Sequence, residues 1–276
     1  MRFAFAGCDR NLALFEAVQH AGWQPVKIFT VSHDEKSTHS NGLLTLARHT
    51  SIPLQYTPIQ RQDFIDLKED GCDVLIVGSY DFKIPPWQEY LRYAINFHPS
   101  PLPTGRGPYP LVNAILHQHR YWAVSCHRID AGYDTGAILA DETFTLDQFE
   151  SHESLQIKVQ MAAARLATKV INDFVALWDG AKIQPEGDYW PLFSVEDRTI
   201  DFAETVHRIR LQLRAFCRLE CFAMLSHRPV RIRQGYAWHE SHNEPIGTIV
   251  HNYAGQIVIA CKDGFVVFSD WYFSPT

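Results

Sequence analysis

The sequence predicts an α/β protein in which a Rossmann-like domain with a mostly parallel sheet is followed by a small antiparallel β-barrel. Strand-like and helix-like segments alternate through the first 180 residues. Residues 73–78 (DVLIVG) form a continuous apolar run, which is typical of a strand buried on both faces of a parallel sheet. After residue 205, short apolar segments are separated by the turn residues Ala254-Gly255 and Asp263-Gly264, which indicates antiparallel hairpins.

The elements of the first domain follow from hydrophobic periodicity and from the positions of glycine and proline. We expect strands over residues 2–6, 25–31, 54–57, 73–78, 93–98, 122–129 and 137–144. We expect helices over residues 11–21, 43–49 and 62–69, a helix that opens near Pro110, and one long helix over residues 150–180. The chain therefore opens with a β-α-β unit, but residues 7–12 (GCDRNL) lack the glycine pattern of dinucleotide-binding folds, so a dinucleotide cofactor is disfavoured.

Composition changes at residues 184–191 (QPEGDYWP), where we expect a linker. The predicted organisation is a first domain over residues 1–183, a linker over 184–204 and a second domain over 205–276. The second domain is expected to hold one helix and four short strands, over residues 205–216, 229–233, 247–250, 256–260 and 265–268. Its arginines either meet a phosphorylated substrate or are solvated charges; they are Arg208, Arg210, Arg231 and Arg233.

Composition bounds the classes of function. The chain has 276 residues and a formal net charge of -6, which gives no general attraction to nucleic acid or to anionic membranes. No apolar run approaches ~20 residues and no signal peptide is recognisable, so we expect a soluble cytoplasmic protein. Six cysteines show no spacing typical of a disulfide scaffold or a metal site, so buried free thiols are expected. The oligomeric state is left open, with a homodimer among the options.

The stretch from residue 94 to residue 136 carries the candidate chemistry. Asn96 and His98 end a predicted strand two residues apart, so their side chains point to the same face. Asp134 lies in a glycine-bearing loop that follows the predicted strand 122–129. An amide can stabilise an oxyanion, an imidazole can also donate or can move a proton, and a carboxylate can hold the imidazolium or accept the proton of an amine. Together the three predict acyl transfer to an amine.

A structural interpretation stands beside this functional one. Asn96 could cap the strand end, His98 could pack under the proline-rich loop 99–108, and Asp134 could make a local turn bond. For each residue alone the structural interpretation is favoured, whereas the set of three after two strands favours function.

Residues 96–103 (NFHPSPLP), Arg106-Gly107, His127 and the later Asp134-x-Gly136 resemble the motif of the folate-dependent formyltransferase family. That family includes methionyl-tRNA formyltransferase, glycinamide ribonucleotide transformylase and the sugar N-formyltransferases. The similarity extends over most of residues 1–180 and, more weakly, over the C-terminal part. Pro101 departs from the family, which more often has leucine there, but it is apolar and lies in a loop already rich in proline.

The resemblance implies a formyltransferase domain with an OB-like barrel behind it, and 10-formyltetrahydrofolate as the formyl donor. It implies that Asn96, His98 and Asp134 are catalytic and that no metal is needed, because the donor carries a neutral acyl group. Arg106 and Gly107 are expected to bind the substrate, and Arg106 has the alternative of bracing the proline-rich loop. The resemblance also implies that the folate pteridine lies between segment 80–85 and loop 130–134, which assigns cofactor binding to Tyr80, Phe82, Ile84, Asp130 and Tyr133.

The acceptor is expected to be the primary amine of a small molecule, and a nucleotide-linked amino sugar fits best. Residues 32–42 (SHDEKSTHSNG) correspond to a longer, basic loop in methionyl-tRNA formyltransferases, yet they contain one lysine, no arginine and two acidic residues. Phosphate binding needs clustered cations, so a nucleic-acid partner is disfavoured. Methionyl-tRNA formylation, hydrolysis of 10-formyltetrahydrofolate and non-catalytic folate binding remain as alternatives.

Overall fold

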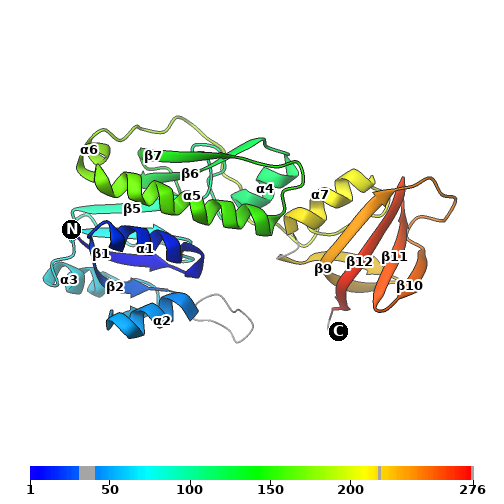
Figure 1. The fold of residues 1–276 in the computed structure, drawn as a ribbon, viewed down its shortest axis with the longest axis horizontal. Coiled ribbons are helices and arrows are strands. Elements are labelled where there is room, and N and C mark those ends of the chain that lie inside the picture. Colours follow the sequence, from blue (N-terminus) through cyan, green and yellow to red (C-terminus); the bar gives the residue numbers. More distant parts are fainter. Residues whose placement is uncertain (31–40, 217–218, 275–276) are drawn as a thin grey trace. The chain divides into compact units, whose positions relative to one another are not determined.

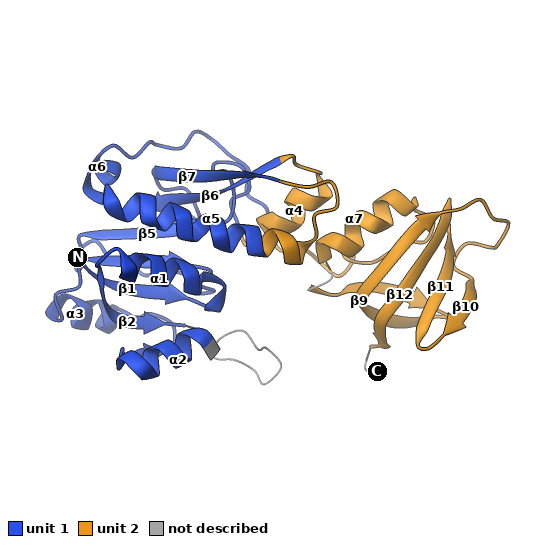
Figure 2. Cartoon of the chain, in the orientation of Figure 1, with its two compact units in different colours: residues 1–107, 121–145, 157–190 blue, residues 108–120, 146–156, 191–276 orange. Residues whose placement is uncertain are grey.

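The structure is a computed structural model that describes residues 1–30, 41–216 and 219–274. Most of the polar loop predicted over residues 32–42 lies outside these described residues. The chain divides into two compact units, residues 1–107, 121–145 and 157–190 in the first and residues 108–120, 146–156 and 191–276 in the second (Figure 2). The predicted domain boundaries stay predictions.

The first unit is built on a seven-stranded sheet with the order β3-β2-β1-β4-β5-β6-β7. Its strands are β1 (Arg2–Gly7), β2 (Gln24–Phe29), β3 (Leu54–Gln55), β4 (Val74–Gly78), β5 (Tyr93–His98), β6 (Tyr121–Arg128) and β7 (Ile138–Thr145). The first five are mutually parallel, whereas β6 runs antiparallel to both β5 and β7. The predicted mostly parallel α/β fold is therefore confirmed, and β6 is the exception to it.

Helices cover both faces of this sheet (Figure 1). They are α1 (Leu12–His20, after the short 3-10 turn η1, Asp9–Asn11), α2 (Asn41–Thr50), α3 (Arg61–Glu69), α5 (His152–Asn172) and α6 (Phe174–Asp179). Because side chains alternate along a strand, Phe3 and Phe5 of β1 pack against Phe15 of α1. Ala4 and Ala6 face the other way and join a core cluster that also contains residues of α3.

The prediction of a single helix over residues 150–180 is wrong, because the structure has two helices there. The chain leaves the helical path at Asp173, where φ is -120° and ψ is 27°, and α6 begins at the next residue. The ring of Phe174 lies 5.0 Å, edge-on, from the rings of both Trp23 and Tyr93. The apolar stripe along residues 150–180 is uninterrupted in the sequence, so it does not indicate the break between α5 and α6. That break accompanies the packing of Phe174 against aromatic rings of the first unit.

The second unit contains an all-antiparallel five-stranded sheet, as predicted, with the order β10-β11-β12-β9-β8. Its elements are α4 (Pro110–Leu116), α7 (Val206–Phe216), β8 (Cys221–Leu225), β9 (Arg228–His239), β10 (Ile249–Tyr253), β11 (Gln256–Cys261) and β12 (Gly264–Phe273). Ala254 and Gly255 both have positive φ, 51° and 80°, as a tight hairpin turn requires. Strand β8 was not predicted; it begins at Cys221.

Three of the four C-terminal arginines, Arg210, Arg231 and Arg233, have partners within the fold. Arg231 Nη1 and Arg233 Nε each lie 3.1 Å from the Glu220 carboxylate. Arg210 Nε donates to the Ala237 carbonyl over 2.7 Å. Among the described residues we find no helix that is long and apolar enough to span a bilayer, and no group of three or more His, Cys, Asp or Glu side chains placed to hold a metal ion.

Candidate active site

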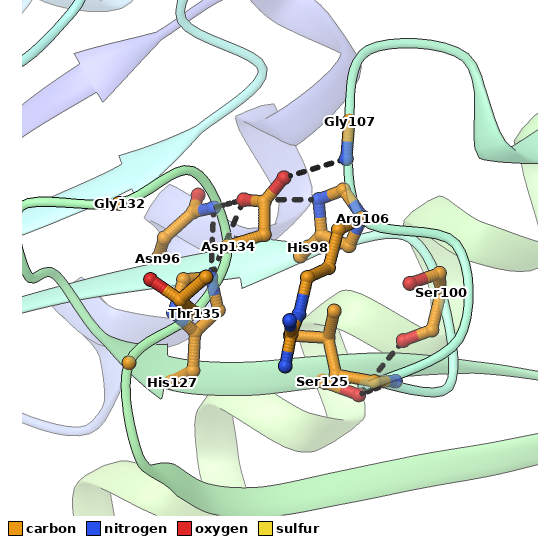
Figure 3. A network of polar contacts seen from close by, with 12 residues as sticks. Asn96, His98, Ser100, Arg106, Gly107, Ser125, His127, Gly132, Asp134 and Thr135 are labelled. Carbon is orange, nitrogen blue, oxygen red and sulfur yellow. Dashed lines mark hydrogen bonds and ion pairs between the residues drawn. The ribbon is translucent and has the colours of Figure 1, made fainter. Parts of the chain in front are cut away.

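Strand β5 presents Asn96 and His98 at its carboxyl end, and antiparallel β6 lies alongside (Figure 3). Asn96 is paired with His127 in the strand register, and His98 is paired with Ser125. Residues that are paired across two strands point to the same face, so β6 adds a second imidazole and a hydroxyl to the amide and imidazole of β5. His98, Ser125 and His127 are all buried.

Asp134 reaches the same site from the hairpin between β6 and β7. Its Oδ1 lies 3.3 Å from Asn96 Nδ2, 3.4 Å from His98 Nδ1 and 3.6 Å from His127 Nε2. Its Oδ2 accepts the backbone N–H of Gly107 over 2.9 Å. The predicted convergence of Asn96, His98 and Asp134 on one place is therefore seen in the described structure, although β6 runs antiparallel and its loop has to fold back to reach the end of β5.

The proline-rich loop that follows β5 is fixed by the same cluster. His98 Nε2 lies 2.8 Å from the Gly105 carbonyl oxygen. Gly107 has φ 107°, and a Cβ there would lie 2.3 Å from the Trp190 carbonyl oxygen, so only glycine fits. The backbone N–H that meets Asp134 therefore sits on a residue for which no side chain is tolerated.

Hydrogen bonds set the tautomers of the two imidazoles. His127 Nδ1 lies 2.7 Å from the Arg128 carbonyl oxygen, which can only accept, so Nδ1 carries the proton. His127 Nε2 then accepts from Asn96 Nδ2, 3.1 Å away. By the same argument His98 Nε2 donates to Gly105, and the neutral ring turns an unprotonated Nδ1 toward Asp134. The free Nδ1 of His98 is the natural place in this cluster for an incoming proton.

Burial raises the pKa of the Asp134 carboxyl, but the neighbouring His127 and His98 rings and the Gly107 N–H outweigh burial and hold that pKa at about 2. Burial lowers the pKa of His98 from its ordinary value of about 6.5, and Asp134 only partly restores it. At neutral pH the site therefore combines a carboxylate with a neutral imidazole. Because the pKa of His98 is lower in the folded chain than in the unfolded one, its contribution to stability is complete above about pH 6.5 and is lost as the pH falls below that value.

The charge state of His98 can be measured directly. In an NMR titration we expect the His98 ring signal, assigned by its absence from the His98→Gln spectrum, to have a midpoint below about 6.5. In Asp134→Asn the midpoint should fall further, because the carboxylate that favours the protonated ring has been removed. A wild-type midpoint above 7, or a midpoint that rises in Asp134→Asn, would contradict this electrostatic description.

The first predicted folate-binding segment combines a core contact with exposed aromatic surface. The Tyr80 hydroxyl accepts the Ile59 N–H over 3.1 Å, and Ile84 packs partly buried against the core of the first unit. The Phe82 ring is 38% exposed and lies 5.4 Å, edge-on, from the Tyr80 ring. Phe82 therefore offers exposed aromatic surface to a flat ligand ring, whereas Tyr80 and Ile84 are only partly exposed.

The second predicted segment, loop 130–134, approaches the first one. Lys83 Nζ lies 5.6 Å from the centre of the Tyr133 ring, which is 58% exposed. Asp130 is occupied differently: its Oδ1 accepts the Gly132 N–H and the Thr135 hydroxyl, over 3.1 and 2.7 Å. Its carboxylate shapes the loop, whereas Tyr133 faces outward; the folate-binding role of both segments stays a prediction.

Arg106 shows the contacts of a brace. Its Nη2 donates to Gln184 Oε1 over 2.8 Å and to the Pro185 carbonyl over 3.0 Å, and its Nε lies 3.2 Å from Gln184 Oε1. The backbone of Arg106 pairs with the segment 188–190. Residues 184–190, which the sequence placed in the linker, thus pack along the proline-rich loop within the first unit.

His127 was named in the sequence motif without a role in the site, and Ser125 and Gln184 were not predicted as members of it. The first two could have been found, because Ser125-x-His127 repeats on β6 the two-residue spacing of Asn96-x-His98 on β5. Ser125 Oγ donates to the Ser100 carbonyl over 2.7 Å and accepts the Leu102 N–H over 3.1 Å. Gln184 carries no local signal, because its position depends on how a distant segment returns to the loop.

Comparisons with known proteins agree with this fold. Residues 14–171 match the family described as "Formyl transferase", and residues 193–273 match "Formyl transferase, C-terminal domain". A methionyl-tRNA formyltransferase from Rickettsia massiliae is 27% identical over 226 residues, which cover 80% of this chain and 74% of that protein.

Two solved structures share the fold over nearly all of this chain. An N-formyltransferase from Helicobacter canadensis, described in complex with folinic acid and dTDP-3-aminofucose, is 18% identical with a TM-score of 0.70, covering 98% of this chain and 99% of that one. HypX from Aquifex aeolicus, described in complex with tetrahydrofolic acid, is 18% identical with a TM-score of 0.75. This chain spans 44% of the HypX chain, and 100% of this chain is covered.

Proposed function

The chain belongs to the formyl transferase family, and from that premise we propose that it transfers a formyl group from 10-formyltetrahydrofolate to the primary amine of a small molecule. The observation that carries the proposal is the cluster in which Asn96 Nδ2 and His98 Nδ1 lie 3.3 and 3.4 Å from Asp134 Oδ1. The bound donor supplies an activated formyl group. The residues of this chain have to hold that group, stabilise negative charge on its oxygen and take a proton from the amine.

His98 is suited to the proton transfer. Its Nε2 is committed to Gly105, so Nδ1 can accept the proton that the attacking amine loses. The resulting imidazolium lies 3.4 Å from Asp134 Oδ1, and the low pKa of Asp134 keeps that carboxylate ionised. Burial keeps the resting ring neutral, which is the state that a proton acceptor requires.

Asn96 is suited to charge stabilisation. Its Nδ2 directs one N–H at His127 and the other, over the longer 3.3 Å contact, at Asp134. A formyl oxygen can displace the weaker contact and accept that N–H. His127 accepts the other N–H of the Asn96 amide. This bond keeps the amide nitrogen of Asn96, rather than the amide oxygen, directed at the site of the formyl oxygen.

The two predicted folate-binding segments carry surface suited to a folate. Exposed aromatic surface at Phe82 and Tyr133 flanks Lys83, and flat rings pack well on such surfaces. In this proposal Tyr80 and Ile84 support the pteridine site from beneath, and Asp130 keeps its loop in shape. The Helicobacter structure described with folinic acid supports the same donor class.

We propose that the acceptor is a nucleotide-linked amino sugar. The net charge of -6 and the weakly cationic sequence of residues 32–42 favour a small acceptor. The Helicobacter protein, described with dTDP-3-aminofucose, supports this class. Methionyl-tRNA is the second candidate, because the curated relatives include methionyl-tRNA formyltransferases.

Turnover of 10-formyltetrahydrofolate with and without amines tests the proposal. Turnover is measured as the release of tetrahydrofolate. We expect it to be slow without an amine and to rise by about a hundredfold or more when an aminated sugar nucleotide is added. The reason is that the protein does not hold a water molecule at the place from which the amine attacks. Equal turnover with and without amine, with formate as the product, would identify a hydrolase. Folate binding without turnover under any condition would identify a non-catalytic binder.

A further inference from the structure

One side chain, that of Gln184, joins the two loops that surround the catalytic cluster. Its Nε2 donates to the backbone carbonyls of Asp134 and Gly136, over 2.9 and 2.7 Å. Its Oε1 accepts from the Arg106 guanidinium over 2.8 Å. The orientation of the amide is determined, because the two carbonyls can only accept and the guanidinium can only donate.

The loop that Gln184 holds needs an external support. Asp134 has φ 57°, a left-handed conformation that a residue with a side chain seldom adopts and that surrounding contacts must stabilise. The next glycine is also constrained, since a Cβ on Gly136 would lie 1.9 Å from the Arg128 carbonyl oxygen. The Gln184 amide bonds the carbonyls of these two residues, on either side of Thr135.

Gln184 itself belongs to a segment that is fixed to the proline-rich loop. The Arg106 N–H donates to the Asp188 carbonyl over 3.1 Å, and the Trp190 N–H donates to the Arg106 carbonyl over 2.7 Å. The Trp190 ring stacks on Trp122, with ring centres 6.2 Å apart. The amide of Gln184 therefore bonds from a fixed segment to both loops, one bearing Asp134 and the other bearing Gly107.

We propose that Gln184 is a positioning residue for formyl transfer, which sets the place of the Asp134 carboxylate between His98 and the Gly107 N–H. The inference rests on the proposed function. The inference adds to the proposed function by assigning a role in formyl transfer to a side chain that contacts neither His98 nor Asn96. The hydrogen bond from the Gly107 N–H to Asp134 Oδ2 can be used to monitor the position of the Asp134 carboxylate, because it connects the same two loops that Gln184 joins.

Two substitutions separate the contacts of the amide. Gln184→Glu keeps an acceptor for Arg106 but places a carboxylate oxygen against two carbonyl oxygens, so the 130–136 loop is pushed away. Gln184→Met has a similar length and removes both sets of bonds. At a temperature well below unfolding, we expect each variant to lower kcat by about ten- to a hundredfold, with KM for the amine within about twofold of wild type, because displacement of about 1 Å has effects of that size.

Glu186→Gln is the matched control, since Glu186 lies in the same segment with an exposed side chain, and it should keep the wild-type kcat. Hydrogen exchange of the Gly107 amide gives a readout that does not depend on activity. We expect protection of this amide in the wild type and in Glu186→Gln, and loss of protection in both Gln184 variants.

The outcomes are distinguishable. If the wild type transfers formyl groups and both Gln184 variants keep its kcat, the positioning role is overturned while the proposed function stands. If the wild type transfers nothing, the proposed function fails, and the exchange of Gly107 still decides whether Gln184 places Asp134. If neither variant folds, a wild-type Gly107 amide that exchanges as fast as an unbonded one overturns the inference, and a protected one supports it.

Discussion

Replacing Asp134 with asparagine, or His98 with alanine, is expected to lower kcat for formyl transfer by at least about a hundredfold. Asp134→Asn keeps the shape of the side chain. It removes the negative charge that stabilises the protonated His98 ring at Nδ1. His98→Ala removes the proton acceptor itself. Asn96→Ala, which removes the donor to the developing oxyanion, is expected to have an effect of the same order.

The fold should survive these changes, and the control should not affect activity. Asp141→Asn is the matched control, since Asp141 is an exposed carboxylate on β7 of the same unit. Because His98 and Asp134 act as one unit, the double variant should be little slower than either single variant. Near wild-type kcat in all three single variants would remove the cluster from the chemistry.

The convergence of Asn96, His98 and Asp134 could be predicted because the signals of these residues are local. The two-residue spacing of Asn96 and His98 on a strand predicts a shared face, and the glycines around Asp134 predict a loop that can approach them closely. The arrangement of strands was less accessible. The antiparallel direction of β6 is decided by the path of the chain after β5, which no periodicity in residues 122–129 records.

Contacts between segments far apart in the sequence could not be predicted either, because no local pattern records them. Residues 184–190 are rich in polar and turn-forming residues, which is typical of a linker, yet their backbone pairs with Arg106 and their Gln184 bonds Asp134 and Gly136. Such a pattern depends on a partner some 78 residues away. The break between α5 and α6 was also hidden, because an apolar stripe continues through Asp173.

The choice of acceptor should produce the second large effect. A protein that binds tRNA neutralises several phosphates with Lys or Arg and loses affinity steeply as salt increases. This chain has a net charge of -6, and its Arg231 and Arg233 already pair with Glu220. We therefore expect methionyl-tRNA to be formylated at least about a hundredfold less efficiently, in kcat/KM, than an aminated sugar nucleotide.

A competition experiment tests the whole account most directly. Formyl-labelled 10-formyltetrahydrofolate is supplied to the wild type and to Asp134→Asn, with charged initiator tRNA and an aminated sugar nucleotide present together, at low and at high salt. We predict that the wild type places the label on the sugar amine at both salt concentrations and that Asp134→Asn leaves it on the folate. Label recovered on methionyl-tRNA with a steep salt dependence, or as formate regardless of the amine, would contradict the account.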